Sequence, residues 1–196
     1  MFKLGLTGSI GMGKSTTGTL FVEAGCALWD ADAAVHRLYA KGGAAVPHFQ
    51  KAFPEAVIDG EVSRTVLKDI IARDPGALKR IEAIVHPLVG QDRAAFIEGA
   101  DADILVLDIP LLFETGGEAR VDAVACVIVD EVTQKERVME RGTMTEAQFE
   151  NIKSKQLPAA EKAARADYVI ETDTIEHARA QVQAVVQDIR SKLADA

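Results

Sequence analysis

Residues 8–15 read GSIGMGKS, and this stretch decides the fold. It fits the pattern Gly-x4-Gly-Lys-Ser/Thr in full, between a short apolar run at residues 3–7 and a helical pattern over residues 14–24. Glycines let the backbone curl so that successive N–H groups point inward, and a helix N-terminus adds partial positive charge. The stretch therefore predicts a strand–loop–helix unit that binds a polyphosphate.

Each side chain at the end of this loop has an expected task. We expect Lys14 to reach the β- and γ-phosphates of a nucleotide, the Ser15 hydroxyl to ligate Mg²⁺, and Thr16 to donate to the α-phosphate. The predicted nucleotide-binding positions of the loop are Gly8, Ser9, Ile10, Gly11, Met12, Gly13, Lys14, Ser15 and Thr16.

The composition excludes several classes of protein. The chain has 196 residues, 48% of them apolar, and a formal charge of −8, which argue against a disordered chain and against a nucleic-acid-coating protein. No apolar run approaches the length of about 20 residues that a membrane helix needs, and the start lacks the layout of a secretory signal. Cys26 and Cys126 match no metal or redox spacing. We expect a cytoplasmic protein with two buried thiols.

Short apolar runs alternate with helical patterns along most of the chain. Strands are predicted at residues 3–7, 26–29, 103–109, 121–129 and 168–170. Helices are predicted at residues 14–24, 32–40, 133–141, 144–156 and 175–193, with Thr145 as a cap. Strands separated by helices indicate a parallel sheet with helices on both faces.

The stretch from about residue 34 to residue 99 reads as a helical insertion without a convincing strand. Ser63 is expected to cap a helix that runs to Arg73, and Pro75 to stand in the first turn of the next helix. His86-Pro87 is expected to interrupt or kink that helix, because proline removes a backbone donor. His86 could also meet a ligand.

Two acidic residues follow the second predicted strand. The carboxyl ends of parallel strands face the ligand crevice, so Asp30 and Asp32 are placed near the phosphates. Asp32 is the candidate general base for an acceptor hydroxyl, and Asp30 could support it. The alternative is that one of them only caps the following helix.

Asp108 closes the third predicted strand. An acid at this point suits the metal side of a nucleotide site, whereas the alternative is a partner for a helix terminus. Arg137 and Arg141 stand four residues apart and share a helix face, where they could neutralise a transferring phosphoryl group or form a solvated surface. No Asn-Lys-x-Asp guanine reader is present, and a chain of this size suits a small-molecule or nucleotide kinase.

With these residues in place, the chain resembles the dephospho-CoA kinase family over nearly its whole length. The motifs that carry the resemblance are residues 6–16, Asp30-Ala31-Asp32, His86-Pro87, Ile109-Pro110-Leu111-Leu112-Phe113-Glu114, Arg137 with Arg141, Gln156, and Ala166-Asp167.

The resemblance implies ATP-dependent phosphorylation of the ribose 3′-hydroxyl of dephospho-CoA, which gives CoA and ADP, with ATP and Mg²⁺ required. It implies a P-loop three-layer α/β/α sandwich around a five-stranded parallel sheet. The core would be residues 1–33, 100–133 and 166–196, the helical acceptor-binding insertion about 34–99, and the helical lid about 134–165. ATP and dephospho-CoA would be the only partners of a monomer or weak homo-oligomer, with no nucleic acid and no membrane.

The resemblance also assigns roles to residues. Asp32, Lys14 and Arg141 would be catalytic, Arg137 would join the nucleotide-binding set, and Ser15 with Asp108 would hold the metal. The implied acceptor-binding residues are Asp32, Tyr39, His86, Pro110, Leu111, Leu112, Phe113 and Glu114.

The chain departs from the family pattern at four points. Ser9 stands where glycine is frequent, and Met12 stands where serine is common. After the last strand the family often has an asparagine with a glycine soon after, and here the run is Ile170-Glu171-Thr172-Asp173. Trp29 replaces a smaller aliphatic residue and is expected to pack under the acceptor site. Two other functions remain open at this point: a kinase for another small acceptor, such as a nucleoside monophosphate or a sugar, and a nucleotide-binding regulator without turnover.

Overall fold

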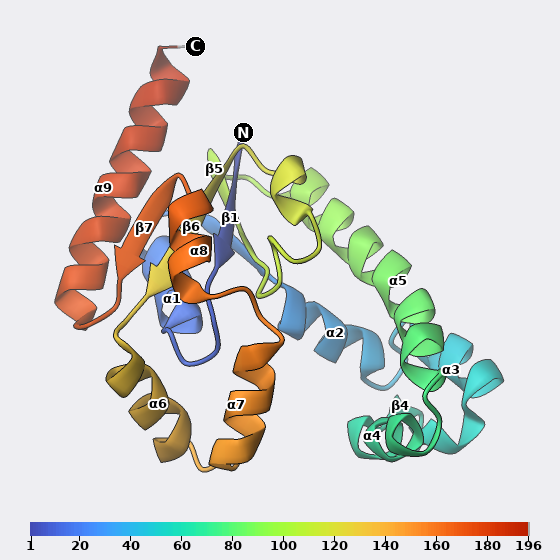
Figure 1. The fold of residues 1–196 in the computed structure, drawn as a ribbon. Helices are drawn as coiled ribbons and strands as arrows, with labels where there is room; N and C mark the ends of the chain where they lie inside the picture. Colours follow the sequence, from blue (N-terminus) through green and yellow to red (C-terminus); the bar gives the residue numbers. More distant parts are fainter. Residues whose placement is uncertain (196) are drawn as a thin grey trace. The chain divides into compact units, whose positions relative to one another are not determined.

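The computed structural model describes residues 1–195, which form two compact units (Figure 1). The first unit comprises residues 1–29 and the chain from residue 100 onward, and the second is Asp30–Gly99.

The first unit is built on a five-stranded sheet. Its strands are β1 (Phe2–Thr7), β2 (Ala27–Asp30), β5 (Ile104–Asp108), β6 (Ala123–Ile128) and β7 (Tyr168–Glu171), in the order β2-β5-β1-β6-β7. β1 pairs in parallel with β5 and β6, and β6 pairs in parallel with β7. The predicted α/β class and five-stranded parallel sheet are confirmed.

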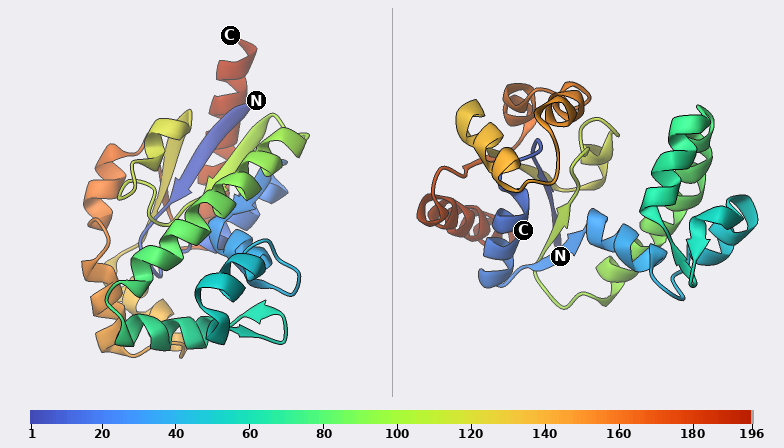
Figure 2. Two further views of the ribbon diagram at one scale, coloured as in Figure 1. Left: turned by 90° about the vertical axis from the view of Figure 1, so that its right-hand side faces the viewer. Right: turned by 90° about the horizontal axis from the view of Figure 1, so that it is seen from below.

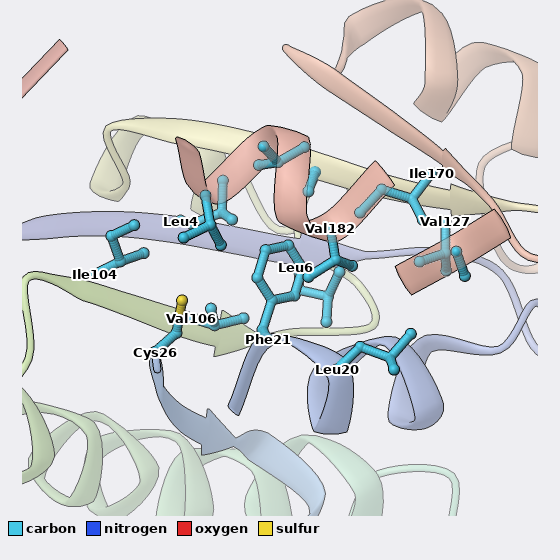
Figure 3. Close-up of a cluster of buried hydrophobic side chains, with 14 of the residues drawn as sticks. Leu4, Leu6, Leu20, Phe21, Cys26, Ile104, Val106, Val127, Ile170 and Val182 are labelled. Atoms are coloured by element: carbon cyan, nitrogen blue, oxygen red, sulfur yellow. The ribbon is translucent and has the colours of Figure 1, made fainter. Parts of the chain in front are cut away.

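Alternation along the strands gives the sheet two buried faces. Leu4 and Leu6 of β1 point into a core cluster with Phe21 of α1 (Lys14–Glu23) and Val182 of α9 (Ile175–Ala194), as Figure 3 shows. A Cβ on the intervening Gly5 would lie 2.8 Å from Leu112 on the opposite face. The sheet is therefore the middle of three layers, with α1 and α9 on one side and α8 (Ala159–Arg165) on the other (Figure 2).

Three helices lie between β6 and β7 in the chain. α6 (Glu131–Glu140) is capped by Asp130, whose carboxylate accepts from the N–H of Thr133. α7 (Glu146–Ser154) begins with a capping box of Thr145 and Gln148, so the predicted Thr145 cap is confirmed. α8 and the 3₁₀ helix η2 (Gly117–Arg120) were not predicted from the sequence, because both are too short for a periodic apolar face.

The second unit has a core of its own, in which Phe49, Phe53 and Ile81 are buried. Its elements are α2 (Ala31–Tyr39), α3 (Val46–Ala52), η1 (Pro54–Ala56), β3 (Val57–Ile58), β4 (Glu61–Val62), α4 (Arg64–Arg73) and α5 (Ala77–Gly99). The expectation of no strand here is wrong, because β3 and β4 form an antiparallel hairpin. Its two central residues, Asp59 and Gly60, both have positive φ, the Asp-Gly pattern that favours a two-residue hairpin turn.

α5 continues past Pro87, so an interruption at His86-Pro87 is wrong, and the alternative of a kink stays a prediction. The proline leaves the carbonyl of Ala83 without its usual helical donor, but both residues are exposed and water can satisfy that carbonyl. The helix also begins two residues after Pro75, behind a turn in which Asp74 accepts from the N–H of Gly76. Among residues 1–195, no helix combines the length and the apolar character that crossing a membrane requires.

Candidate active site

The GSIGMGKS stretch forms the loop between β1 and α1. Gly11 has φ +78° and Gly13 has φ +85°, a left-handed conformation that other residues rarely adopt. Gly13 is the N-cap of α1, and neither a side-chain cap nor an acidic residue occupies the first turn. The N–H groups at this helix start therefore face a position suited to an anion.

The side chains of the loop divide into buried and accessible ones. Ser9 and Met12 are buried, so at the two loop positions that depart from the family pattern the side chain is turned inward. Ser15 and Thr16 are exposed at the start of α1, where a ligand can reach both hydroxyls. The two hydroxyls predicted to bind Mg²⁺ and the α-phosphate, those of Ser15 and Thr16, are therefore both accessible.

Lys14 is ion-paired with Asp108 at the carboxyl end of β5. The Asp108 side chain is only 1% exposed, and that of Lys14 is 15% exposed. The structure brings these two predicted residues together beside the loop. The ammonium of Lys14 supplies the opposite charge next to this buried carboxylate.

Three side chains from distant parts of the chain hold the backbone of the loop. Gln134 of α6 donates from Nε2 to the Ile10 carbonyl over 2.7 Å, and the Ile10 N–H donates to Oε1 of Gln156 over 3.1 Å. The hydroxyl of Thr172, just after β7, donates to the Met12 carbonyl over 2.8 Å. Sequence reasoning assigned no such role to any of the three, because each contact depends on the tertiary fold.

The two arginines of α6 differ in their surroundings. Arg137 donates to the Thr172 carbonyl over 2.6 Å and to its hydroxyl over 3.1 Å. The guanidinium of Arg141 is exposed and forms no hydrogen bond or ion pair within residues 1–195. A cavity of about 260 Å³ has both arginines in its lining, together with Gly13, Thr16 and Thr174. Arg141 is therefore the arginine with donors available for a ligand at the loop.

The residues 110–114 that follow β5 are mostly committed to contacts inside the first unit. Leu112 and Phe113 are buried in a small core cluster with Val124, and the Arg165 guanidinium lies 4.4 Å from the centre of the Phe113 ring. Pro110 and Glu114 both contact the buried Lys162, which the sequence analysis missed. Leu111, 42% exposed, is the one large apolar side chain of this stretch that faces solvent.

The remaining predicted site residues belong to the second unit. Asp30 is the N-cap of α2 and accepts from the N–H of Ala33 over 2.8 Å, so the capping alternative holds for Asp30. Asp32 lies in the first turn of α2 with its side chain exposed, and His86 is exposed on α5. The carboxylate of Asp32 is accessible and is not engaged as the cap.

Tyr39 is placed in the core of the second unit rather than on its surface. Its ring packs edge-on against Phe49, with 5.3 Å between the ring centres, and it is 9% exposed. Burial raises the pKa of its phenol, and the nearby Arg64 opposes that rise. The predicted contact of Tyr39 with the acceptor gains no support from this position.

The sequence of this chain is similar to those of known proteins over nearly its whole length. The family model described as dephospho-CoA kinase matches residues 2–177. A dephospho-CoA kinase of Ruegeria pomeroyi is 70% identical over 190 residues, which cover 97% of this chain and 96% of the relative.

Two solved structures are similar in fold. TT1252 from Thermus thermophilus has a TM-score of 0.85 at 31% identity, covering 95% of this chain and 96% of that one. The dephospho-CoA kinase from Campylobacter jejuni has a TM-score of 0.69 at 22% identity, with the same coverage of each chain, and supports the fold alone. On the match of the family model and the identity to the Ruegeria protein, this chain belongs to the dephospho-CoA kinase family.

Proposed function

We propose that the chain transfers the γ-phosphoryl group of ATP to the ribose 3′-hydroxyl of dephospho-CoA, giving CoA and ADP, the last step of coenzyme A synthesis. The observation that carries this proposal is the loop at the start of α1, with the Lys14–Asp108 pair beside it, in a chain of this family. A cytoplasmic location is part of the proposal, since ATP is supplied there and Cys26 and Cys126 are free thiols.

The nucleotide would bind with its phosphates on the loop. Lys14 and Arg141 would spread the charge that develops on the transferring group, and Thr16 would donate to the α-phosphate. Arg137 would act differently, because its guanidinium is held by Thr172 and so fixes the end of β7 against the loop. Phosphoryl transfer asks little covalent chemistry of a protein, so positioning of positive charge is the main contribution.

The residues present fit Mg²⁺. Ser15 offers an exposed hydroxyl and Asp108 a carboxylate, the oxygen ligands that this ion prefers alongside phosphate and water. When bound, Mg²⁺ supplies charge neutralisation between the phosphate groups. Asp108 would leave part of its interaction with Lys14, whose ammonium would turn toward the phosphates.

The acceptor would be bound by the helical insertion, residues 34–99, and by the start of the 110–114 stretch. Asp32 would orient the 3′-hydroxyl and accept its proton, for which its exposed carboxylate is suited. The segment 134–165 would act as a lid that excludes water, which would otherwise hydrolyse ATP. His86, Pro110 and Leu111 would contact the acceptor.

The test is ADP release from ATP and Mg²⁺ with dephospho-CoA, beside AMP, CMP, shikimate and gluconate, with the position of the new phosphate read by mass and NMR. We expect turnover with dephospho-CoA alone and a 3′-phosphate product. Turnover with another of these acceptors in its place would support the other kinase function. ATP binding with no turnover on any acceptor would support a regulatory protein.

The base is tested by Asp32→Asn with Asp30→Ser as its control. Asp32→Asn should lower kcat by about 10²–10⁴-fold and leave ATP affinity unchanged, because a positioned general base contributes that much. Asp30→Ser retains a helix cap and should keep most of the activity. If Asp32→Asn stays within about threefold of the parent, the base is another residue.

A further inference from the structure

The backbone carbonyl and the backbone N–H of Ile10 each form a hydrogen bond with a glutamine side chain. Gln134 donates to the carbonyl over 2.7 Å, and Gln156 accepts from the N–H over 3.1 Å. Gln134 belongs to α6, and Gln156 lies between α7 and α8. Both glutamines therefore come from the segment proposed as the lid, and both hold the same residue of the phosphate loop.

The side-chain amide of Gln134 is buried with only part of its hydrogen-bonding capacity satisfied. Its side chain is fully buried, and its Oε1 atom has no hydrogen-bond partner among residues 1–195. A buried amide oxygen without a donor destabilises the fold, so an apolar side chain of similar size would be favoured if packing were the only demand. The hydrogen bond from Nε2 to the Ile10 carbonyl is the interaction that offsets this cost.

Steric contact reinforces the hydrogen bonds. A Cβ added to Gly11 would lie 2.5 Å from Val138 Cγ2 and 2.9 Å from the Gln134 carbonyl oxygen, so α6 lies directly against the loop. The next carbonyl, that of Met12, is held by Thr172. The conformation of the loop is thus specified by contacts outside it, before any phosphate is present.

We propose that Gln134 and Gln156 are positioning residues that couple the segment 131–156 to the phosphate loop and keep the loop in its nucleotide-binding conformation. The proposal rests on the proposed function only in that phosphates bind at this loop. The Ile10 N–H is engaged by Gln156, which removes it from the set of amides that face the phosphates. Under this proposal, Ile10 contributes to nucleotide binding indirectly, through the shape of the loop.

The first test compares Gln134→Met and Gln156→Met with Gln183→Met on the exposed face of α9. All three changes remove an amide and keep its length. ATP affinity is measured by direct binding, without an acceptor, and folding by thermal unfolding. We expect each of the first two variants to bind ATP about five- to tenfold more weakly, the value of one net hydrogen bond, and Gln183→Met to match the parent.

A double variant tests whether the two glutamines act through one residue. If they do, Gln134→Met/Gln156→Met should lose less affinity than the product of the two single losses. A loss equal to the product would mean that they act independently and would overturn the coupling. If the folded single variants bind ATP with an affinity within twofold of the parent, the positioning role is overturned as well.

Amide hydrogen exchange of Ile10 in the ligand-free protein gives a readout that is independent of charge on the nucleotide. Gln156→Met should speed the exchange of this amide, whereas Gln156→Glu retains an acceptor oxygen and should keep the amide protected. Equal exchange in both variants would overturn the proposal. These changes are at a half-buried position, so they test it even if Gln134→Met does not fold.

Kinetics separate this inference from the proposed function. If dephospho-CoA is the acceptor, the two Gln→Met variants should raise the KM for ATP about five- to tenfold and leave the KM for dephospho-CoA unchanged. If dephospho-CoA is inert, the proposed function fails while the binding and exchange results still decide the role of the glutamines.

Discussion

Lys162 and Glu114 form an ion pair inside the first unit, with 2.9 Å between Nζ and Oε1, and the Lys162 side chain has no exposed surface. The same ammonium donates to the Pro110 carbonyl over 3.0 Å, and Glu114 also accepts from the N–H of Leu157 over 2.9 Å. The pair therefore fastens both ends of the 110–114 stretch to α8 and to the residues before it. Glu114 therefore anchors this stretch, and its predicted contact with the acceptor stays a prediction.

Breaking this pair from one side should be strongly destabilising. Lys162→Met leaves the Glu114 carboxylate without its cation and should lower the free energy of unfolding by about 3–5 kcal/mol, measured by urea titration. Lys162→Met/Glu114→Gln removes both charges and should recover part of that loss. A double variant as unstable as the single one would show that packing, and not the stranded charge, sets the effect.

The same carboxyl predicts a pH dependence of stability. Burial acts to raise the pKa of Glu114, but the hydrogen bonds from Lys162 and from the Leu157 N–H outweigh it and hold the pKa below its ordinary value. A depressed carboxyl pKa stabilises the fold fully above the unfolded-state pKa, about 4.3, and that contribution is lost as the pH falls through the folded-state pKa. Stability should therefore decline below about pH 4.5.

The measurement is the urea midpoint between pH 3 and pH 6 for the parent and for Glu114→Gln. Other carboxyls with depressed pKa values, among them Asp103, contribute to the decline in both proteins. The variant should start lower at pH 6 and decline less steeply. Parallel curves would show that Glu114 does not carry this part of the acid response.

Arg137 and Arg141 should respond differently to truncation. Arg137→Ala removes both hydrogen bonds to Thr172 and should lower the free energy of unfolding by about 1–3 kcal/mol, with weaker ATP binding. Arg141→Ala should leave stability within about 0.5 kcal/mol and lower kcat by about 10²–10³-fold, since this exposed arginine has donors to offer. Unfolding curves and steady-state kinetics of the two variants check these predictions. A stability loss in Arg141→Ala and a kcat loss without a stability loss in Arg137→Ala would exchange the two roles.

Gly11 and Gly142 offer a matched pair of glycine substitutions. Both have positive φ, +78° and +62°, so alanine should cost about 1–2 kcal/mol of conformational strain at either position. At Gly142 nothing lies within 4 Å of the added Cβ, whereas at Gly11 it would meet Val138 and the Gln134 carbonyl. Gly11→Ala should abolish ATP binding and Gly142→Ala should preserve it, as measured by titration with ATP. Equal binding by both would mean that the loop tolerates displacement of α6.

The parts of the fold that local pattern specifies could be predicted from the sequence. The loop at residues 8–15 and the apolar runs of β5 and β6 carry their own signals, and so does the capping box at Thr145. The hairpin at residues 57–62 could not be predicted, because strands of two residues leave no alternation to detect. The Asp59-Gly60 dipeptide was the available signal.

The phosphate-loop motif of the site could be predicted from the sequence, but the residues that hold the loop and its neighbours in place could not. Lys162 stands in a short polar helix where a lysine reads as solvated, and only the tertiary fold shows it to be buried beside Glu114. Gln134 and Thr172 likewise carry no local mark of their contacts with the loop. Asp30 and Asp32 have the same side chain two residues apart, so spacing alone could not tell which one caps α2.

Three hydrogen bonds hold the backbone of the phosphate loop. Their partners are separated in the sequence by 124, 146 and 160 positions. During synthesis, the loop residues leave the ribosome before all three of these partners, and Thr172 is the last of the three to emerge. A nascent chain that already carries GSIGMGKS but ends before Gln134 lacks all three contacts. We therefore expect this loop to be less ordered in such a nascent chain, and to bind nucleotide more weakly, than in the folded protein.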